Sequence, residues 1–281
     1  MFSKMRCALS GTLSCLACWL LISCGSTPSS SEDEDVASDS AEVFIDTLIL
    51  VHDAPLPESV DELFGDFFFN FATDPRFAIT RLRLPLRSRS NPEEEFISRE
   101  QWDEQQPMAV PEFVSVIYER EQDMEVQNDT SLSHVQVWRI YLRENREECY
   151  YFCKVKGRWI LQDYDLVDWH ETPMGDFLDY LSEVSADTLL YADYVRFPLR
   201  WVMVSDDGEE TIEEELWAED WEELREEVPL SEGLLVCIDY GQPALSDNRK
   251  ILSMEGLSNG LYIKFKFDKA GGRWWLYEVE L

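Results

Sequence analysis

The stretch Phe64-Gly-Asp-Phe-Phe-Phe-Asn-Phe71 decides the fold, because a similar stretch occurs again later in the chain. It returns without a gap as Phe177-Leu-Asp-Tyr-Leu-Ser-Glu-Val184, at an offset of 113 residues. The same offset aligns Arg83-Leu-Pro-Leu-Arg87 with Arg196-Phe-Pro-Leu-Arg200. Similarity that persists at a fixed offset is typical of a duplicated structural unit. The repeated stretch therefore marks the start of two copies of one module.

Further matches follow in the same order along the chain. They pair Ile97 with Ile212, Trp102 with Trp217, and Gly157-Arg-Trp-Ile-Leu161 with Gly272-Arg-Trp-Trp-Leu276. Chance is a poor explanation for three ordered matches. We therefore predict two tandem domains, at residues 44–169 and 170–281, each of a size that can form its own hydrophobic core.

Each copy is predicted to open with a helix. Ser59 and Glu62 fit a capping box ahead of the phenylalanines, which recur at helical spacing. Thr172, with Pro173 at the first helical position, starts the second helix. An extended segment and a short acidic helix follow in each copy. Strands are then predicted at 113–118, 135–142, 150–155 and 159–166, and at 234–240, 261–267 and 274–281. Helices ahead of an antiparallel sheet predict an α+β fold.

At these residues the chain resembles a known group of folds. The opening helix and the closing Gly-Arg-Trp-x-Leu hairpin resemble the nuclear-transport-factor-2-like superfamily of cone-shaped α+β domains. The phenylalanine-rich helix followed by Arg-x-Pro-Leu-Arg resembles, more narrowly, lipoproteins of gut-type Gram-negative bacteria that carry a domain of unknown function. The resemblance implies two tandem cone-shaped domains, each with N-terminal helices packed on a curved antiparallel sheet. It implies little about activity, because this fold serves isomerases, dehydratases and binding domains alike.

The N-terminus indicates a lipid anchor. A basic segment and an apolar stretch lead to Leu21-Ile-Ser-Cys24, which resembles the lipobox of bacterial lipoproteins. We expect a signal peptide at 1–23, then a disordered acidic and Ser-rich tether at 24–43 that begins with Cys24 carrying acyl chains such as palmitate in the lipid bilayer. An ordinary cleaved signal or an N-terminal anchor is the alternative. Gly25 favours the outer membrane by resemblance to enterobacterial sorting rules. The sequence is compatible with either the periplasmic or the surface face of that membrane.

The charge of the chain restricts its partners. The sequence has 57 acidic and 24 basic residues, which gives a net charge of −33. This charge argues against a nucleic acid partner, because phosphate binding requires Lys and Arg. Hydrophobic residues make up 45% of the chain, enough to build a folded core. A protein or glycan partner in the cell envelope is compatible with this composition, and no cofactor is expected.

Two pairs of arginines are the candidate ligand-binding residues. Arg83 and Arg87 alternate with leucines along one extended segment, and Arg196 and Arg200 occupy the matching positions in the second copy. Guanidinium groups on one face could bind a carboxylate or sulfate. The alternative is that they pair with the chain's own surplus of acidic residues.

An active site is not evident. Asp168 and His170 are two residues apart, so they could face the same way on a strand, but they lie at the expected domain linker. The histidines have no metal-ligand spacing, so no metal site is predicted. The recurring tryptophans are expected in the core rather than on a sugar-binding surface. They are Trp102, Trp159, Trp217 and Trp274.

Three cysteines follow the tether, so at most one disulfide can form within the body of the protein. Cys149 and Cys153 are expected on one strand and too far apart to bridge each other, which leaves Cys237 as the possible partner of either.

The expected function is non-catalytic binding. An anchor, a tether and duplicated modules without a catalytic constellation favour a membrane-anchored protein of the cell envelope that binds a ligand or partner. The alternative is an isomerase- or hydrolase-type enzyme. That alternative requires a pocket in one cone-shaped domain, lined by an Asp or His at hydrogen-bonding distance from a second polar group.

Overall fold

The computed structural model describes residues 58–281, apart from 106, 109–112, 187–190, 206–209, 225–232, 244–247 and 258–259. Cys24, the predicted signal peptide and the predicted tether lie outside the described residues. The first half contains, in order, η1 (Glu58–Asp61, a 3-10 helix), α2 (Phe64–Thr73), α3 (Pro75–Thr80), β1 (Leu82–Ser88), β2 (Phe96–Ile97), α4 (Arg99–Gln105), β3 (Phe113–Tyr118), η2 (Glu121–Asn128), β4 (His134–Tyr141), β5 (Arg146–Val155) and β6 (Arg158–Val167). The second half contains η3 (Trp169–Glu171), α5 (Gly175–Ala186), η4 (Tyr191–Tyr194), β7 (Val195–Val204), β8 (Thr211–Leu216), α6 (Ala218–Leu224), β9 (Leu234–Asp239), β10 (Arg249–Gly256), β11 (Tyr262–Ala270) and β12 (Arg273–Glu280).

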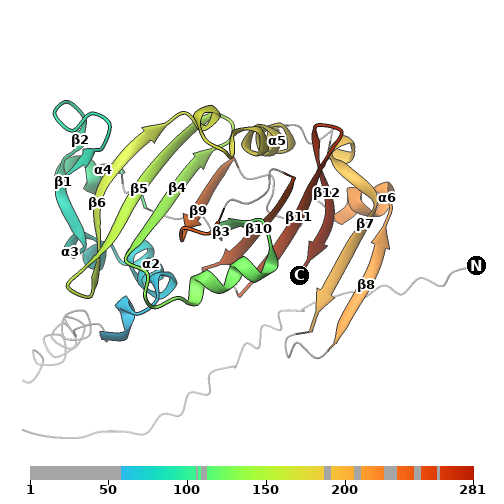
Figure 1. Cartoon of the computed structure of the whole chain (residues 1–281), viewed down its shortest axis with the longest axis horizontal. Helices are drawn as coiled ribbons and strands as arrows, with labels where there is room; N and C mark the ends of the chain where they lie inside the picture. The colour runs from blue at the N-terminus through green and yellow to red at the C-terminus, as the bar shows by residue number, and fades with distance from the viewer. Residues whose placement is uncertain are drawn as a thin grey trace, which may run out of the picture. The chain divides into compact units, whose positions relative to one another are not determined.

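Twelve strands form one sheet, which confirms the α+β class. Their order is β2-β1-β6-β5-β4-β9-β3-β10-β11-β12-β7-β8. Each strand of the first half has a counterpart six strands later, so β1 corresponds to β7 and β2 to β8. Replacing every strand by its counterpart gives the same strand order in reverse. The sheet curves across the whole described unit, with α5 near its top and α2 near its bottom in Figure 1. The two halves of the chain therefore have the same topology around the centre of one sheet.

The two halves exchange a strand at this centre. β9 of the second half pairs with β4 of the first, and β3 of the first half pairs with β10 of the second, both antiparallel. β3 and β9 meet in parallel, with Ser115 opposite Cys237. The expectation of separate antiparallel sheets needs correction, because the sheet is continuous and mixed, with further parallel pairs at β1/β6 and β7/β12. The exchange covers edges of β4 and β10 that would otherwise be unpaired. The domain boundaries at 44–169 and 170–281 stay a prediction.

Two hydrophobic cores lie on opposite faces of the sheet. On β9, Val236 and Ile238 belong to the core that contains α2, whereas Leu235 and Cys237 belong to the core that contains α5. Successive side chains of a strand point to opposite faces, so the two helices cover opposite faces of the central strands. Each half thus buries its own helix against strands supplied by both halves.

The start of α2 differs from the expected capping box. A 3-10 helix covers Glu58–Asp61, and α2 begins at Phe64 without a side-chain cap. Asp61 instead accepts two hydrogen bonds of 2.9 Å from the buried Arg81 guanidinium and one of 2.9 Å from the Trp159 amide. Phe152 packs edge-on against four phenylalanines of α2, all of which are buried as predicted. The second helix likewise begins late, at Gly175 rather than Thr172.

One of the sequence matches is wrong by four residues. Trp102 is the fourth residue of α4 and is buried, and the fourth residue of α6 is Trp221, which is 1% exposed. Trp217 is 56% exposed and precedes α6, so it is not a core residue. The pairing of the edge strands agrees, because Ile97 lies opposite Leu86 and Leu216 lies opposite Leu199. Leu86 and Ile97 are 11 residues apart in the chain, whereas Leu199 and Leu216 are 17 apart, because β7 and β8 form a longer hairpin. This difference shifts the alignment there.

Candidate binding pocket

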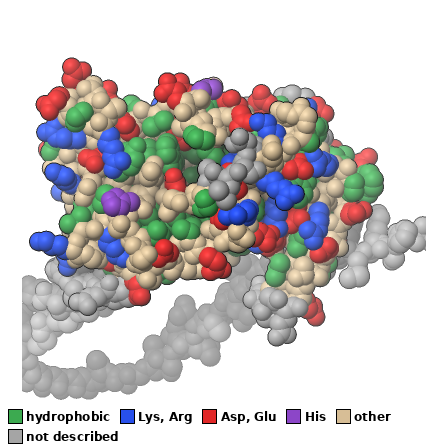
Figure 2. Space-filling model, in the orientation of Figure 1, with side chains coloured by type: hydrophobic (Ala, Val, Ile, Leu, Met, Phe, Trp, Pro, Cys, Tyr) green, Lys and Arg blue, Asp and Glu red, His purple; other side chains and the backbone are tan. Residues whose placement is uncertain are grey.

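A pocket lies between the central strands and the N-terminal end of α5, on the face that α5 covers. We call it the α5 pocket; its volume is about 300 Å³. Strand residues of its wall are Ile117, Trp138, Ile140, Glu147, Cys237, Ile238, Asp239 and Lys250. The other wall residues are Glu119, Thr172, Pro173, Met174, Leu178, Gln242 and Pro243. In the view of Figure 2, apolar side chains gather over β4 and β5, with acidic and basic side chains around them.

The floor of the α5 pocket follows from strand register. Trp138 on β4 lies opposite Cys237 on β9, and Ile140 lies opposite Glu147 on β5. Residues opposite each other point to the same face, so the floor carries an indole, a thiol and an aliphatic chain beside one carboxyl group. Met174 and Leu178 close the pocket from the side of α5. The pocket is therefore apolar along most of its length.

Glu147 is the exceptional residue of this floor. Its exposed fraction is 4%, and burial alone raises the pKa of its carboxyl group to about 7. Within the described residues, no donor lies at hydrogen-bonding distance from its Oε2. A buried acceptor without a donor is unfavourable, because it has lost its hydration and gained no partner. Glu147 therefore contributes to the pocket wall a buried carboxyl group, one oxygen of which has no hydrogen-bond partner.

The other charged groups of the wall are better compensated. Lys250 on β10 donates to Glu119 across 2.7 Å, and both side chains are buried, so together they are neutral. Asp239 lies at the opposite end of β9 from Leu235, the residue level with Glu147. Burial raises the pKa of Asp239, against a hydrogen bond from the Gly241 amide and one from the Trp138 side chain. The pocket therefore carries an excess of negative charge.

A second pocket lies on the other face, beside α2. This α2 pocket has a volume of about 360 Å³ and is lined by residues from α2, β3, β9 and β10. Strand register relates the two pockets. On β4 and β5, Ile140 lies opposite Glu147; on β10 and β11, Glu255, the equivalent of Ile140, lies opposite Tyr262. Asp239 lies opposite Gln136, and the corresponding pair on β3 and β10 is Tyr118 and Ile251.

The buried charges are specific to the α5 pocket. By the same register, Tyr262 is the counterpart of Glu147 and Tyr118 is the counterpart of Asp239. Tyr240 corresponds to Glu119, and Val135 corresponds to Lys250. The acids that do line the α2 pocket, Asp66 and Glu255, are exposed. The duplicated fold therefore does not itself require charged residues at these four positions.

The predicted arginines lie on β1 and β7, next to opposite ends of the sheet, and are not brought together. Arg196 makes a bidentate ion pair with Asp268, at 2.6 and 2.7 Å. Arg87 donates to the Pro92 carbonyl, and Arg83 is exposed. A ligand-binding role for these arginines stays a prediction, while intramolecular pairing already occupies Arg87, Arg196 and Arg200.

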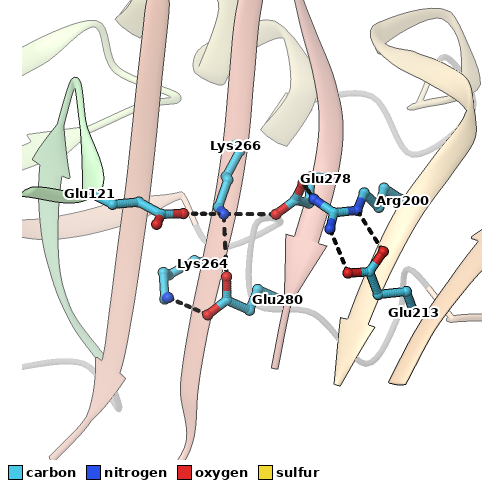
Figure 3. Close-up of polar contacts among 7 residues, drawn as sticks. All are labelled: Glu121, Arg200, Glu213, Lys264, Lys266, Glu278 and Glu280. Carbon is cyan, nitrogen blue, oxygen red and sulfur yellow. Dashed lines mark hydrogen bonds and ion pairs between the residues drawn. The ribbon is translucent and has the colours of Figure 1, made fainter. Parts of the chain in front are cut away.

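Arg200 belongs to a larger network of charges, drawn in Figure 3. It bonds to Glu213 on β8 at 2.7 Å and to Glu278 on β12 at 2.5 Å. Lys266 on β11 contacts Glu278 and also Glu121 of η2, in the first half of the chain. Burial would lower the pKa of Lys266, but these two carboxylates outweigh it and raise the pKa. The network thus ties the η2 segment to the sheet of the second half.

The network is completed by Lys264 and Glu280, which contact each other, and Glu280 also contacts Lys266. The sequence signal that could have revealed the network is the spacing of these residues. Lys264 and Lys266 are two residues apart on one strand, and Glu278 and Glu280 are two residues apart on the neighbouring strand. The signal for the pocket acids was weaker, since Glu147 stands between Arg146 and Glu148 and Asp239 is a single acid beside apolar residues.

The expected acid–histidine pair does form, but outside the pockets. Asp168 Oδ1 lies 2.7 Å from His170 Nδ1, and His170 Nε2 lies 3.2 Å from Asp179. The hydrogen bond with Asp168 is the main cause of a raised His170 pKa. All three side chains are about half exposed. The geometry is that of a surface ion pair at the junction of the halves.

The described part of the chain has three cysteines. Cys149, Cys153 and Cys237 are all free there. Cys149 and Cys237 both lie opposite Trp138 on its two sides, which places them two strands apart, about 10 Å and beyond disulfide reach. No cluster of three or more His, Cys, Asp or Glu in the described residues could hold a metal ion. No helix of the described residues is both long and apolar enough to span a bilayer.

The family model for a domain of unknown function, DUF4348, matches residues 45–281. The chain belongs to the DUF4348 family. This DUF4348 chain is also similar to an NTF2-like protein from Bacteroides fragilis NCTC 9343, whose crystal structure is known. The two are 29% identical, with a TM-score of 0.67, and the match covers 80% of this chain and 98% of that one. No curated protein matches. The DUF4348 chain thus has the nuclear-transport-factor-2-like fold that its sequence resembles.

Proposed function

We propose that the protein binds a small ligand without catalysis and that the α5 pocket is the binding site. The observation that carries the proposal is a pocket of about 300 Å³ with apolar walls and a few buried polar groups. Small-ligand sites are commonly built in this way, with apolar contacts for affinity and few polar groups for orientation. The acid–histidine pair of Asp168 and His170 lies on the surface, so it lends no support to a reaction in the pocket.

We further propose that Cys24 anchors the protein in the cell envelope, in the outer membrane. Acyl chains on this cysteine and the acidic tether would hold two cone-shaped, strand-exchanging units near the bilayer. A protein or glycan of the envelope is the partner that such a location allows. The test is membrane fractionation of Cys24→Ala. We expect release from the membrane fraction, and unchanged fractionation would refute the anchor.

The ligand proposal is tested by identifying what the protein carries. Protein purified from its native envelope is extracted with solvent, and co-purifying small molecules are identified by mass spectrometry. Met174→Trp places a large side chain at the wall of the α5 pocket, and Leu63→Trp does the same at the α2 pocket as a matched control. We expect one compound that is retained by Leu63→Trp and lost by Met174→Trp. Equal recovery from both variants, or no compound from any protein, contradicts the proposal.

A further inference from the structure

The α5 pocket combines apolar walls with an uncompensated carboxyl group. We propose that its ligand is an alkylammonium compound, a positively charged amine on an apolar chain, and that the Glu147 carboxylate accepts the ammonium group. This inference rests on the proposed function, since it names the class of ligand for the same pocket. Its test is designed so that the ligand class can fail while the pocket stands.

The first argument is the unsatisfied oxygen of Glu147. The side chain is almost completely buried, and the described residues offer its Oε2 no hydrogen-bond donor. An ammonium group supplies up to three donors and a compensating charge. A charge-assisted hydrogen bond of this kind is stronger than one between neutral groups. The ligand would therefore satisfy the group that folding leaves unsatisfied.

The second argument is the comparison between the two pockets. The α2 pocket has the same topology, yet Tyr262 stands where the α5 pocket has Glu147. Tyr118 likewise stands where the α5 pocket has Asp239. Because a fold requirement would apply to both copies, the buried carboxyl group of Glu147 and the partly buried one of Asp239 are explained better by a ligand than by the architecture. Burial of an acid is costly without such a partner.

The third argument is the shape and charge of the wall. Glu147 lies level with Leu235 of β9, because both are opposite Ile140. Leu235 and Asp239 are four residues apart on this strand, so the levels of the two carboxyl groups are about 13 Å apart along it. Trp138 lies between these levels, where an aromatic face can attract a cation and an apolar chain can pack. Lys250 is neutralised by Glu119. An anionic ligand would thus meet an excess of negative charge, whereas an alkylammonium compound can place its charged group at Glu147 and pack its apolar chain along Trp138.

The affinity should depend on the ionisation of Glu147. The charged or ionisable groups that face it are Cys149 on its own strand, Cys237 and Asp239 on β9, and the ion pair between Glu119, directly after β3, and Lys250 on β10. The wall residues Thr172, Pro173, Met174 and Leu178 have no ionisable side chain. Burial raises the pKa of Cys149 to about 12, so this thiol stays protonated near neutral pH. A cation prefers ionised Glu147, so binding should be tighter at pH 8 than at pH 6.

The experiment is isothermal titration calorimetry of the purified full chain with hexylammonium, 1-hexanol and hexanoate. Glu147→Gln removes the charge with little change of shape. Glu255→Gln is the matched control, because it changes the net charge equally but lies in the α2 pocket. Thermal unfolding checks that both variants fold.

We expect hexylammonium to bind more tightly than 1-hexanol or hexanoate. Glu147→Gln should weaken its binding about tenfold or more, and Glu255→Gln should leave it unchanged. Equal or tighter binding of 1-hexanol or hexanoate, with loss in Met174→Trp, would overturn the ammonium assignment and keep the pocket. Absence of hexylammonium binding, or equal effects of Glu147→Gln and Glu255→Gln, would also overturn the assignment.

Discussion

Replacement of Glu147 by glutamine is expected to stabilise the protein above neutral pH and much less below it. Burial raises the pKa of this carboxyl group from its usual 4.5 to about 7, so the folded chain holds the proton more tightly than the unfolded chain. Between these two values the folded state binds more protons. The free energy of unfolding therefore falls as the pH rises through this window and levels off above it. Glu147→Gln removes this loss, because glutamine does not ionise.

The magnitude follows from the two pKa values. Each tenfold difference in proton affinity corresponds to about 1.4 kcal/mol. A change from 4.5 to about 7 therefore corresponds to about 3 kcal/mol between pH 5 and pH 8. The change from carboxyl to amide has its own effect on stability at every pH. That effect cancels when the difference between variant and wild type at pH 5 is subtracted from the difference at pH 8.

The assay is urea unfolding, followed by tryptophan fluorescence, of the wild type, Glu147→Gln and Glu255→Gln at pH 5 and pH 8. Glu255 is exposed, so its variant should show nearly the same difference from wild type at both pH values. The Glu147→Gln difference should grow with pH by about 2–3 kcal/mol. A change below about 0.5 kcal/mol, or one of opposite sign, would show that Glu147 is hydrated in solution and refute the reasoning.

Other consequences can be measured on the same protein. Asp61→Ala should destabilise it by about 3–5 kcal/mol in urea unfolding, since Arg81 would be left buried without its carboxylate; Asp61→Ala combined with Arg81→Met should recover part of the loss. Phe152→Ala should cost about 3–5 kcal/mol in the same assay, because Phe152 fills the contact between β5 and α2. Cys153 should be alkylated by iodoacetamide at pH 8 well before Cys149, which is fully buried and whose pKa is raised to about 12; equal rates by mass spectrometry would contradict this.

The sequence predicts local features of the fold well and long-range pairing poorly. The spacing of Phe64, Phe67, Phe68 and Phe71 is a local property, and all four are buried as predicted. Nothing in the sequence pattern of β3 or β9 states which strand lies beside it, because both faces of these strands are mostly buried and apolar. Trp217 was misplaced for a related reason, since two tryptophans four residues apart fit the same helical pattern and only pairing of the edge strands selects Trp221.

The candidate site was less predictable than the fold. Glu147 and Asp239 become notable only when strands distant in the chain place them beside one pocket under α5. The arginines of β1 and β7 were visible in the sequence because they alternate with apolar residues. This alternation does not identify the residues with which the arginines pair. Arg196 and Arg200 find theirs on β8, β11 and β12, which the sequence alone could not pair with β7.

The exchange of β3 and β9 also constrains how the chain can fold during synthesis. Until β9 emerges, β4 is paired only with β5, and β3 has no neighbour; β3 gains its second neighbour only when β10 is made. The first half must therefore wait for the second with an open sheet edge, which is a state prone to aggregation. Contacts so distant in the chain also make folding slow. Two fragments cut at the junction near Asp168 should consequently fail alone and complement each other when expressed together, as partners in one cooperative unit.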